Sequence, residues 1–363
     1  MRLGAIVVIG ETGRVLAQKG PSLNLPAGAR SAGTRSDALF AEPLGCVEIV
    51  GRSMTERMIE RFLGAGIDTV SVLADAAMAY HPPPFRAFFK NVTVQVVSDL
   101  RSALAHKLSE YYDNGIEHSF VSSSDVYAET DLLDLYYFHR EARQPVTRAF
   151  DRDGPLALWV ADCAKAQQPD FEDLMHEPRR GTGSYFIRSY VNRLAHPRDL
   201  RRFAADTLRG RCESAPSGRE VRPGIWIDSG AEVHRRARIV APAYIGCGTK
   251  IREATLITRL SGIERNCSVD CGTVVEDSSI LANTHVGIWL DVCHAVVKGN
   301  KLLSLGRDVV IEISDPSVMR SSNSVRRATA GVRSRKEEQV SAADLPKAHP
   351  TPGWQFGANL IEE

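Results

Sequence analysis

The feature that most constrains the fold of this chain is a six-residue period in its carboxy-terminal third. An aliphatic residue recurs at every sixth position, ten times without interruption: Ile227, Val233, Ile239, Ile245, Ile251, Ile257, Ile263, Val269, Val275 and Leu281. A small residue stands four positions after each of the first nine: Ala231, Ala237, Ala243, Thr249, Thr255, Ser261, Cys267, Thr273 and Ser279. An α-helix repeats every 3.6 residues and a half-buried strand every two, so neither structure produces this spacing.

A three-sided column of short parallel strands does account for the spacing. Each six-residue unit forms one side of a coil, with the aliphatic residue inside and the small residue at the corner. After Leu281 the register is expected to shift to Ile280, Val286 and Val292, and residues 307–313 to form a closing strand. Cys267 falls at a corner and Cys247 in the same stretch, which predicts packing roles for both thiols.

The amino-terminal part alternates between strand and helix patterns. Strands are predicted at residues 4–10, 69–73, 92–97 and 118–122, and a hairpin at 146–150 and 156–160. Helices are predicted after a capping box at Ser53 and Glu56, from Asp99 through Tyr112, and over residues 130–142. This alternation predicts an α/β fold with a mostly parallel sheet covered by helices on both faces.

Asp125 is the first candidate functional residue, because it closes the run 122–125 directly after a predicted strand. Open α/β sheets bind ligands beyond the carboxyl ends of their strands. A carboxylate at that edge could hold Mg²⁺ on a nucleotide phosphate. An ordinary strand-to-helix turn is the alternative interpretation.

Composition excludes several classes of protein. The 363 residues suffice for two domains, and 45 basic against 44 acidic residues argue against nucleic-acid binding through bulk charge. Seven cysteines without C-x-x-C pairs predict neither a disulfide framework nor a zinc site, which favours a reducing, cytoplasmic location. The apolar run from Ala5 to Ile9 is too short for a membrane span or a secretory signal.

The six-residue pattern resembles the left-handed parallel β-helix of bacterial acyltransferases and sugar nucleotidyltransferases. Together with the preceding α/β part, residues 1–315 resemble the sugar-1-phosphate nucleotidyltransferases, also called NDP-sugar pyrophosphorylases. The stretch from Pro43-Leu44 to Gly66-Ile67 is similar to the segment that follows the family's signature loop. Glu177-Pro178 and residues 182–186 are similar to its sugar-binding Glu-Lys-Pro and the strand after it, without the lysine.

This resemblance implies a Rossmann-like nucleotidyltransferase domain at residues 1–215, a left-handed β-helix at 222–315 and a flexible tail at 316–363. The implied reaction joins an NTP and a sugar 1-phosphate into an NDP-sugar and pyrophosphate. The implied partners are these two substrates and other copies of the chain, which associate through the β-helix. Neither nucleic acid nor a membrane span is expected.

The resemblance also implies roles for single residues. Asp125 would be the catalytic residue that binds Mg²⁺, and Asp228, in a stretch similar to the family's W-x-D-x-G element, would be a second metal ligand. The nucleotide phosphates would be bound by Gly33, Thr34 and Arg35. The sugar would be bound by Glu177, Thr182 and Gly183. Alternatively, Asp228 is a solvent-facing residue of the first coil, because Ile227 starts the six-residue register.

Departures from the family pattern keep two other hypotheses open. The first strand ends in Gly10-Glu11-Thr12-Gly13 instead of a loop with Gly-Thr-Arg, and Leu44 stands where the family has a lysine that neutralises phosphate charge. The chain could therefore be a catalytically silent scaffold or regulatory protein. A third hypothesis is an acyltransferase whose general base is His285 or His294, although the sequence reveals no carboxylate partner for either.

The predicted tail is rich in basic residues. No acidic residue interrupts the stretch that holds Arg320, Arg326, Arg327, Arg333, Arg335 and Lys336. A stretch of this kind is typical of a solvated, flexible arm. An arm that binds an anionic partner or a membrane surface is the alternative.

Overall fold

The computed structural model describes residues 2–10, 39–40, 42–76, 91–165 and 182–322. Residues 1–324 belong to one compact unit. Gly33, Thr34, Arg35 and Glu177 lie outside the described residues, as do the basic residues of the tail beyond Arg320.

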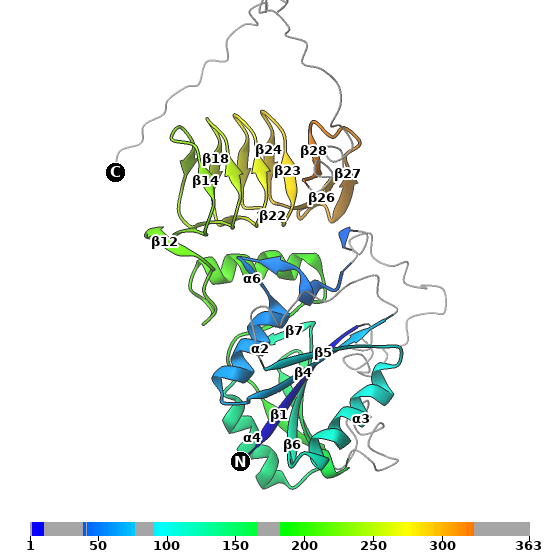
Figure 1. Ribbon diagram of the computed structural model, residues 1–363. Coiled ribbons are helices and arrows are strands. Elements are labelled where there is room, and N and C mark those ends of the chain that lie inside the picture. The colour runs from blue at the N-terminus through cyan, green and yellow to red at the C-terminus, as the bar shows by residue number, and fades with distance from the viewer. Residues whose placement is uncertain (1, 11–38, 41, 77–90, 166–181, 323–363) are drawn as a thin grey trace, which may run out of the picture. The chain divides into compact units, whose positions relative to one another are not determined.

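The amino-terminal part is built on a seven-stranded sheet (Figure 1). Its strands are β1 (Leu3–Ile9), β4 (Thr69–Asp75), β5 (Val92–Val97), β6 (His118–Ser123), β8 (Val146–Asp151), β9 (Gly154–Asp162) and β10 (Thr182–Phe186). Their order across the sheet is β10-β8-β9-β6-β1-β4-β5. The pairs formed by β1, β4, β5 and β6 are parallel, whereas β9 runs antiparallel to β6 and β8. The predicted strands and the added hairpin are confirmed.

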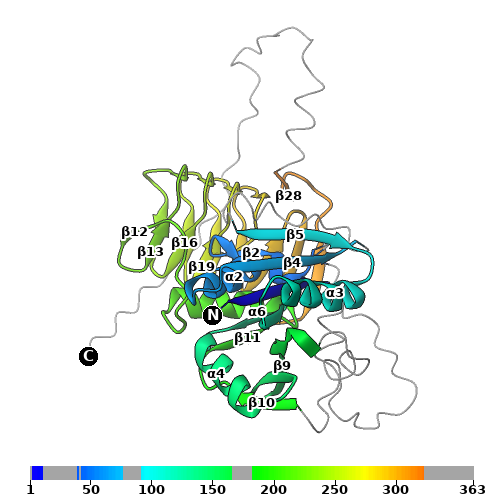
Figure 2. The same cartoon turned by 60° about the horizontal axis from the view of Figure 1, so that its bottom comes forward.

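Four helices accompany this sheet: α2 (Met54–Gly64), α3 (Leu100–Asp113), α4 (Leu132–Ala142) and α6 (Pro197–Leu208). Helix α2 begins with the predicted capping box, and the carboxylate of Asp99 caps α3. Phe62 of α2 contacts Phe120 of β6, whereas Tyr111 of α3 lies against Gly4 of β1. Ser119, the neighbour of Phe120, pairs with Gly4, and successive strand residues face opposite sides, so α2 and α3 cover opposite faces (Figure 2).

Short elements connect this frame. They are the 3₁₀ turns η2 (Leu44–Cys46) and η4 (Cys163–Lys165) and the strands β2 (Glu48–Ile49), β3 (Arg52–Ser53), β7 (Val126–Ala128) and β11 (Val191–Arg193). Strands β2 and β3 form a hairpin whose turn residues Val50 and Gly51 have φ angles of 47° and 88°. The pairing of β7 with β11 and helix α6 have no counterpart in the sequence predictions.

The carboxy-terminal part consists of short strands in three sheets. The first sheet holds β12 (Arg219–Arg222), β13 (Ile225–Ile227), β16 (Ala243–Ile245), β19 (Ser261–Ile263), β22 (Ser279–Ile280), β25 (Ala295–Lys298), β26 (Lys301–Ser304) and β27 (Val309–Glu312). The second holds β14 (Glu232–Val233), β17 (Lys250–Ile251), β20 (Ser268–Val269), β23 (Thr284–Val286) and β28 (Met319–Ser321). The third holds β15 (Arg238–Ile239), β18 (Leu256–Thr258), β21 (Val274–Glu276) and β24 (Asp291–Cys293).

We call this part the column, because each strand of its coils pairs in parallel with the strand one coil later (Figure 1). Ile227 pairs with Ile245, and Ile245 with Ile263, so one coil takes three of the six-residue units. Ile251 and Ile257 are buried in the same interior cluster. The predicted stack of short parallel strands with aliphatic residues inside is confirmed.

One detail of the predicted register is wrong. Ile263 pairs with Ile280, and Val275 with Val292, so the coil becomes one residue shorter between Val275 and Ile280. Ile280 is therefore inside the column, whereas Leu281 packs in the core of the amino-terminal part. The period alone could not detect the missing residue, because both neighbouring side chains are aliphatic.

Hydroxyl groups at the corners link successive coils. Thr249 donates to the carbonyl of Glu264 at 2.6 Å and accepts from the amide of Cys267 at 3.1 Å. At the shortened coil Ser278, and not the predicted Ser279, takes this position: its hydroxyl accepts from the amide of Ala295 at 3.0 Å. Small polar residues thus satisfy buried backbone groups that the sharp corners leave unpaired.

The two cysteines predicted to pack in the column differ. Cys267 is buried as expected, and its thiol donates to the carbonyl of Leu281 at 3.1 Å. Burial raises the pKa of this thiol, which makes it a poor nucleophile. Cys247 is exposed, so its predicted packing role is wrong.

Antiparallel strands close the column. Strand β27 pairs with β26 and confirms the closing strand predicted at residues 307–313. Strand β28 pairs with β23, so Arg320, which the sequence placed in the tail, belongs to the column. Within the part of the chain that the structure describes, no helix has the length and apolar character needed to cross a membrane.

Candidate functional site

Asp125 lies beyond the carboxyl end of β6, a central strand beside β1. Its amide donates to the hydroxyl of Ser123 at 3.2 Å, and its carbonyl accepts from the amide of Leu194 at 2.9 Å. Turn η2 packs on the same edge, because a Cβ on Gly45 would lie 1.7 Å from the carbonyl oxygen of Ser124. Leu44, in the position of the family's lysine, is only 7% exposed.

Asp228 follows β13 in the first coil of the column. Its carboxylate accepts from the amide of Ser229 at 2.6 Å and from the hydroxyl of Tyr244 at 3.5 Å. This is the coil position that the alternative interpretation of Asp228 predicted. Among the described residues, no three or more His, Cys, Asp or Glu side chains form a group that could hold a metal ion. Asp125 alone suits an ion that arrives with a nucleotide, since Mg²⁺ is often bound by one or two carboxylates plus substrate phosphates.

Thr182 and Gly183 are not brought to Asp125. Gly183 pairs with Thr147 of β8, and the pairing continues through β9 to Phe120, which precedes Asp125 on β6 and the turn after it. Standard strand geometry places them about 16 Å apart along the strands and about 14 Å across the sheet. Gly183 has a packing role instead, because a Cβ there would lie 2.6 Å from the hydroxyl of Thr147.

A second polar site lies at one corner of the column, in a cavity of about 830 Å³ that we call the corner pocket. Residues from three successive coils and the end of α6 surround it. They are Arg209, Val240, Ala241, Pro242, Thr258, Arg259, Leu260, Glu276, Asp277, Cys293 and His294.

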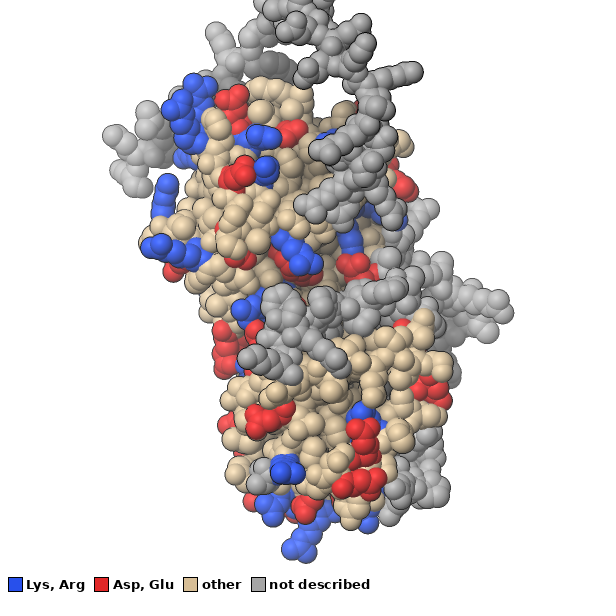
Figure 3. Space-filling view, in the orientation of Figure 1, with Lys and Arg blue, Asp and Glu red and all other residues tan. Residues whose placement is uncertain are grey.

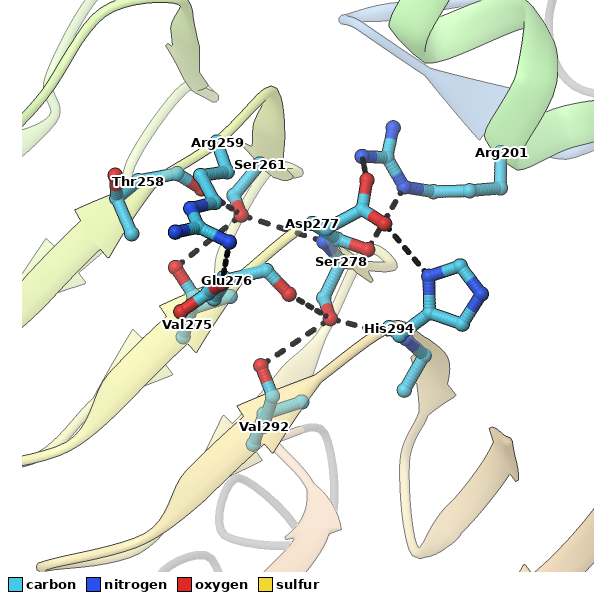
Figure 4. Close-up of polar contacts among 11 residues, drawn as sticks. Arg201, Thr258, Arg259, Ser261, Val275, Glu276, Asp277, Ser278, Val292 and His294 are labelled. Carbon is cyan, nitrogen blue, oxygen red and sulfur yellow. Dashed lines mark hydrogen bonds and ion pairs between the residues drawn. The ribbon is translucent and has the colours of Figure 1, made fainter. Parts of the chain in front are cut away.

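Asp277 and His294 meet in this pocket because they occupy the same corner of successive coils. Glu276 pairs with Cys293 across the sheet, so the residues that follow them are also neighbours. Both have left-handed backbones, with φ angles of 45° and 50°. The carboxylate of Asp277 lies 2.6 Å from Nδ1 of His294 (Figure 4). The shortened coil brings about this stacking.

The expectation that neither candidate histidine has a carboxylate partner is therefore wrong. His294 contacts Asp277, and Nε2 of His285 lies 3.7 Å from the carboxylate of Asp270. Each partner stands about one coil earlier in the sequence, where only the coil geometry makes it a neighbour. The two sites differ in exposure: the side chain of His285 is 9% exposed and that of His294 is 59% exposed.

Helix α6 supplies a third member of the corner site. Nη2 of Arg201 donates to the other carboxylate oxygen of Asp277 at 2.5 Å, and Nε donates to its backbone carbonyl at 3.1 Å (Figure 4). Sequence reasoning missed this helix, although Pro197 at its start and apolar residues at 200, 203, 204 and 208 are a helix signal.

This arrangement can perform general base chemistry. With Nδ1 bound to a carboxylate, the Nε2 atom of His294 is left to accept a proton from a bound molecule. Arg259 forms an ion pair with Glu276 at 2.7 Å on the same wall. Partial burial raises the pKa of the Cys293 thiol, which disfavours a thiolate nucleophile there.

Two buried carboxylates join the column to the β2–β3 hairpin. Glu264 accepts hydrogen bonds from the amides of Val50 at 2.7 Å and Gly51 at 3.0 Å. Burial and the nearby Glu48 raise the pKa of the Glu264 carboxyl well above its ordinary value. Burial likewise raises the pKa of Glu48, which forms an ion pair with Arg265 at 2.8 Å. The hairpin directly follows η2, so the column supports the segment beside Asp125.

Basic and acidic side chains are interspersed on the face drawn in Figure 3, with no extended field of one sign. That distribution agrees with the near-zero net charge. No protein-family model matches the chain, and no curated protein matches it. Both candidate sites are therefore interpreted from their own geometry.

Proposed function

We propose that the chain transfers a nucleotidyl group from an NTP to a sugar 1-phosphate at the edge of the sheet beyond Asp125. The observation that carries this proposal is the position of Asp125 directly after a central strand, with η2 packed against Ser124. Such an edge is where open α/β sheets bind nucleotides.

In the proposed reaction, a phosphate oxygen of the sugar 1-phosphate attacks the α-phosphorus of the NTP. A new P–O bond forms as the bond to the β-phosphate oxygen breaks, and pyrophosphate leaves with that electron pair. Asp125 would hold a Mg²⁺ ion, which supplies positive charge to the phosphates when bound. Because Leu44 provides no charge, Arg35, with Gly33 and Thr34, would bind the remaining phosphate oxygens. Glu177 would orient the sugar.

Nucleotide binding is expected to depend on Asp125. We expect calorimetric titration with each of the four Mg²⁺–NTP complexes to reveal sub-millimolar binding of at least one. Asp125→Asn should abolish this binding, because it removes the ligand of the nucleotide-borne ion. Asp113→Asn, at the exposed end of α3, is the matched control and should leave binding unchanged. Absence of binding for every nucleotide would reject the proposal and favour the silent scaffold.

We propose acyl transfer at the corner pocket as a second candidate function, favoured by the contact between Asp277 and His294. Nε2 of His294 would take the proton from an acceptor hydroxyl or amine, which attacks the carbonyl carbon of an acyl-CoA thioester. The tetrahedral intermediate would collapse as the C–S bond breaks, and the leaving thiolate would take the proton back from His294. The step is balanced and needs no further reactant.

If this second function is correct, His294→Ala is expected to lower kcat by about 10²- to 10⁴-fold, the usual contribution of a general base. The measurement is release of free thiol from acetyl-CoA in the presence of a panel of amine and hydroxyl acceptors. His106→Ala, at an exposed position of α3, should retain full activity. Equal rates for the two variants, or no thiol release by the unaltered protein, would exclude the function.

We further propose that the column winds left-handed and that copies of the chain associate through it in the cytoplasm. The short parallel strands with a six-residue unit support the winding, because the resemblance rests on the same unit. Light-scattering mass measurement tests the association. A mass of one chain, near 39.8 kDa, would contradict it.

A further inference from the structure

Asp277 is held from two directions by groups of different parts of the chain. One carboxylate oxygen contacts Arg201 of α6, and the other contacts His294 of the column. The backbone carbonyl of Asp277 also accepts from Arg201. The carboxylate therefore cannot rotate without breaking a contact to a cationic or ionisable partner.

Arg201 itself has little freedom. Its side chain is 6% exposed, and its helix neighbours Leu200 and Phe203 are fully buried in the core of the amino-terminal part. An arginine whose two donors meet a carboxylate and a carbonyl provides more directional restraint than a single point charge. The position of the Asp277 carboxylate is thus fixed by the α/β part and not by the column alone.

We infer that Arg201 is a positioning residue, which holds Asp277 so that His294 carries its proton on Nδ1 and presents an unprotonated Nε2 to the corner pocket. A neutral histidine binds a proton on one ring nitrogen, and the partner of that nitrogen selects the tautomer. The consequence for catalysis rests on the proposed acyl transfer, but the consequence for the tautomer does not.

A purely structural role for Arg201 is the competing interpretation, and the same helix supplies the matched control. Arg198, one turn earlier on α6, binds Asp308 of the column at 3.2 Å through an ion pair that is exposed on both sides. Arg198 also links α6 to the column, but its ion pair involves neither Asp277 nor His294. A role in docking alone would give similar results for the two arginines.

The test is the tautomer of His294, read from the ¹⁵N chemical shifts of its imidazole nitrogens in alkaline buffer. We expect the Nδ1–H form in the unaltered protein and in Arg198→Met. Arg201→Met, which keeps an unbranched side chain without donors, should lose at least half of that form, as should Asp277→Asn. Arg201→Lys should retain an intermediate fraction, because one ammonium group cannot satisfy both acceptors.

An unchanged tautomer in Arg201→Met would overturn the inference, as would an equal loss in Arg198→Met. If Arg201→Met does not fold, Arg201→Lys decides, and identity with the unaltered protein contradicts the positioning role. Thiol release from acetyl-CoA separates the two proposals. A tautomer that depends on Arg201 without any thiol release would uphold the positioning role and reject acyl transfer.

Discussion

Replacing Glu264 with alanine is expected to destabilise the protein by about 3 kcal/mol or more, because it leaves two buried amides without acceptors. These amides belong to Val50 and Gly51, in the turn between β2 and β3. Arg57 binds the same segment from the other side, donating to the carbonyls of Ile49 and Val50 at 3.1 Å each. Denaturant unfolding of the purified variant measures the loss.

Glu264 also predicts how stability changes with pH. Its pKa rises from an ordinary value of 4.5 to about 8 in the folded protein. Between these values the folded state binds the proton and the unfolded state does not, so stability decreases as pH increases. The contribution of Glu264 is fully present below about pH 4.5 and is lost as the pH rises through about 8.

Glu264→Gln is the variant that isolates this effect, because glutamine keeps the shape of the side chain without the titration. We expect the free energy of unfolding to fall less steeply between about pH 5.5 and about pH 8.5 in Glu264→Gln than in the unaltered protein. Glu60→Gln removes a surface carboxylate paired with Arg52 and should preserve the original slope. Parallel slopes for all three proteins would contradict the assignment.

Ile257→Asn is the second change with a large expected effect. Ile257 is fully buried inside the column, so asparagine there loses apolar burial and places an amide without partners in the interior. We expect a loss of about 4 kcal/mol or more from these two causes together. Thermal and denaturant unfolding measure it.

The adjacent residue provides the control for Ile257. Leu256 is half-buried and lies one position earlier in the same strand, where the side chain points to the opposite face. Leu256→Asn should cost about 1 kcal/mol or less, as expected for a residue outside the core. Equal losses at the two positions, or a larger loss at Leu256, would mean that the column has the opposite register.

The column was predictable because its period is imposed by packing on every coil. Ile245, Ile251 and Ile257 must all face the interior, so the sequence repeats the same requirement. The shortened coil could not be predicted, because Ile280 and Leu281 are both suitable for either buried environment. Only the pairing of Ile263 with Ile280 distinguishes them.

The candidate sites were predictable to different extents. Asp125 follows from a local rule, since the residue after a buried parallel strand lies at the binding edge. The contact of Asp277 with His294 depends on the coil length and on two left-handed corners, which no local pattern indicates. Arg201 was missed for another reason, because its helix carries ordinary start signals that simply were not used.

The measurement that tests the central claim most directly is disulfide formation between cysteines placed on neighbouring coils. The claim is that the coils become one residue shorter after Val275, which stacks Asp277 on His294. Leu256 pairs with Val274, and Val274 with Asp291, at outward positions of the third sheet. Paired strands lie about 4.8 Å apart, within reach of a disulfide.

The background for this experiment is the chain with Cys247, Cys271 and Cys293 changed to serine. Mild oxidation should join the pair Leu256→Cys with Val274→Cys and the pair Val274→Cys with Asp291→Cys. The pair Val274→Cys with Val292→Cys should stay reduced, because Val292 faces the interior. Rapid cross-linking of Val274→Cys with Val292→Cys, together with none for Val274→Cys with Asp291→Cys, would contradict the shortened coil and the stacking of Asp277 on His294.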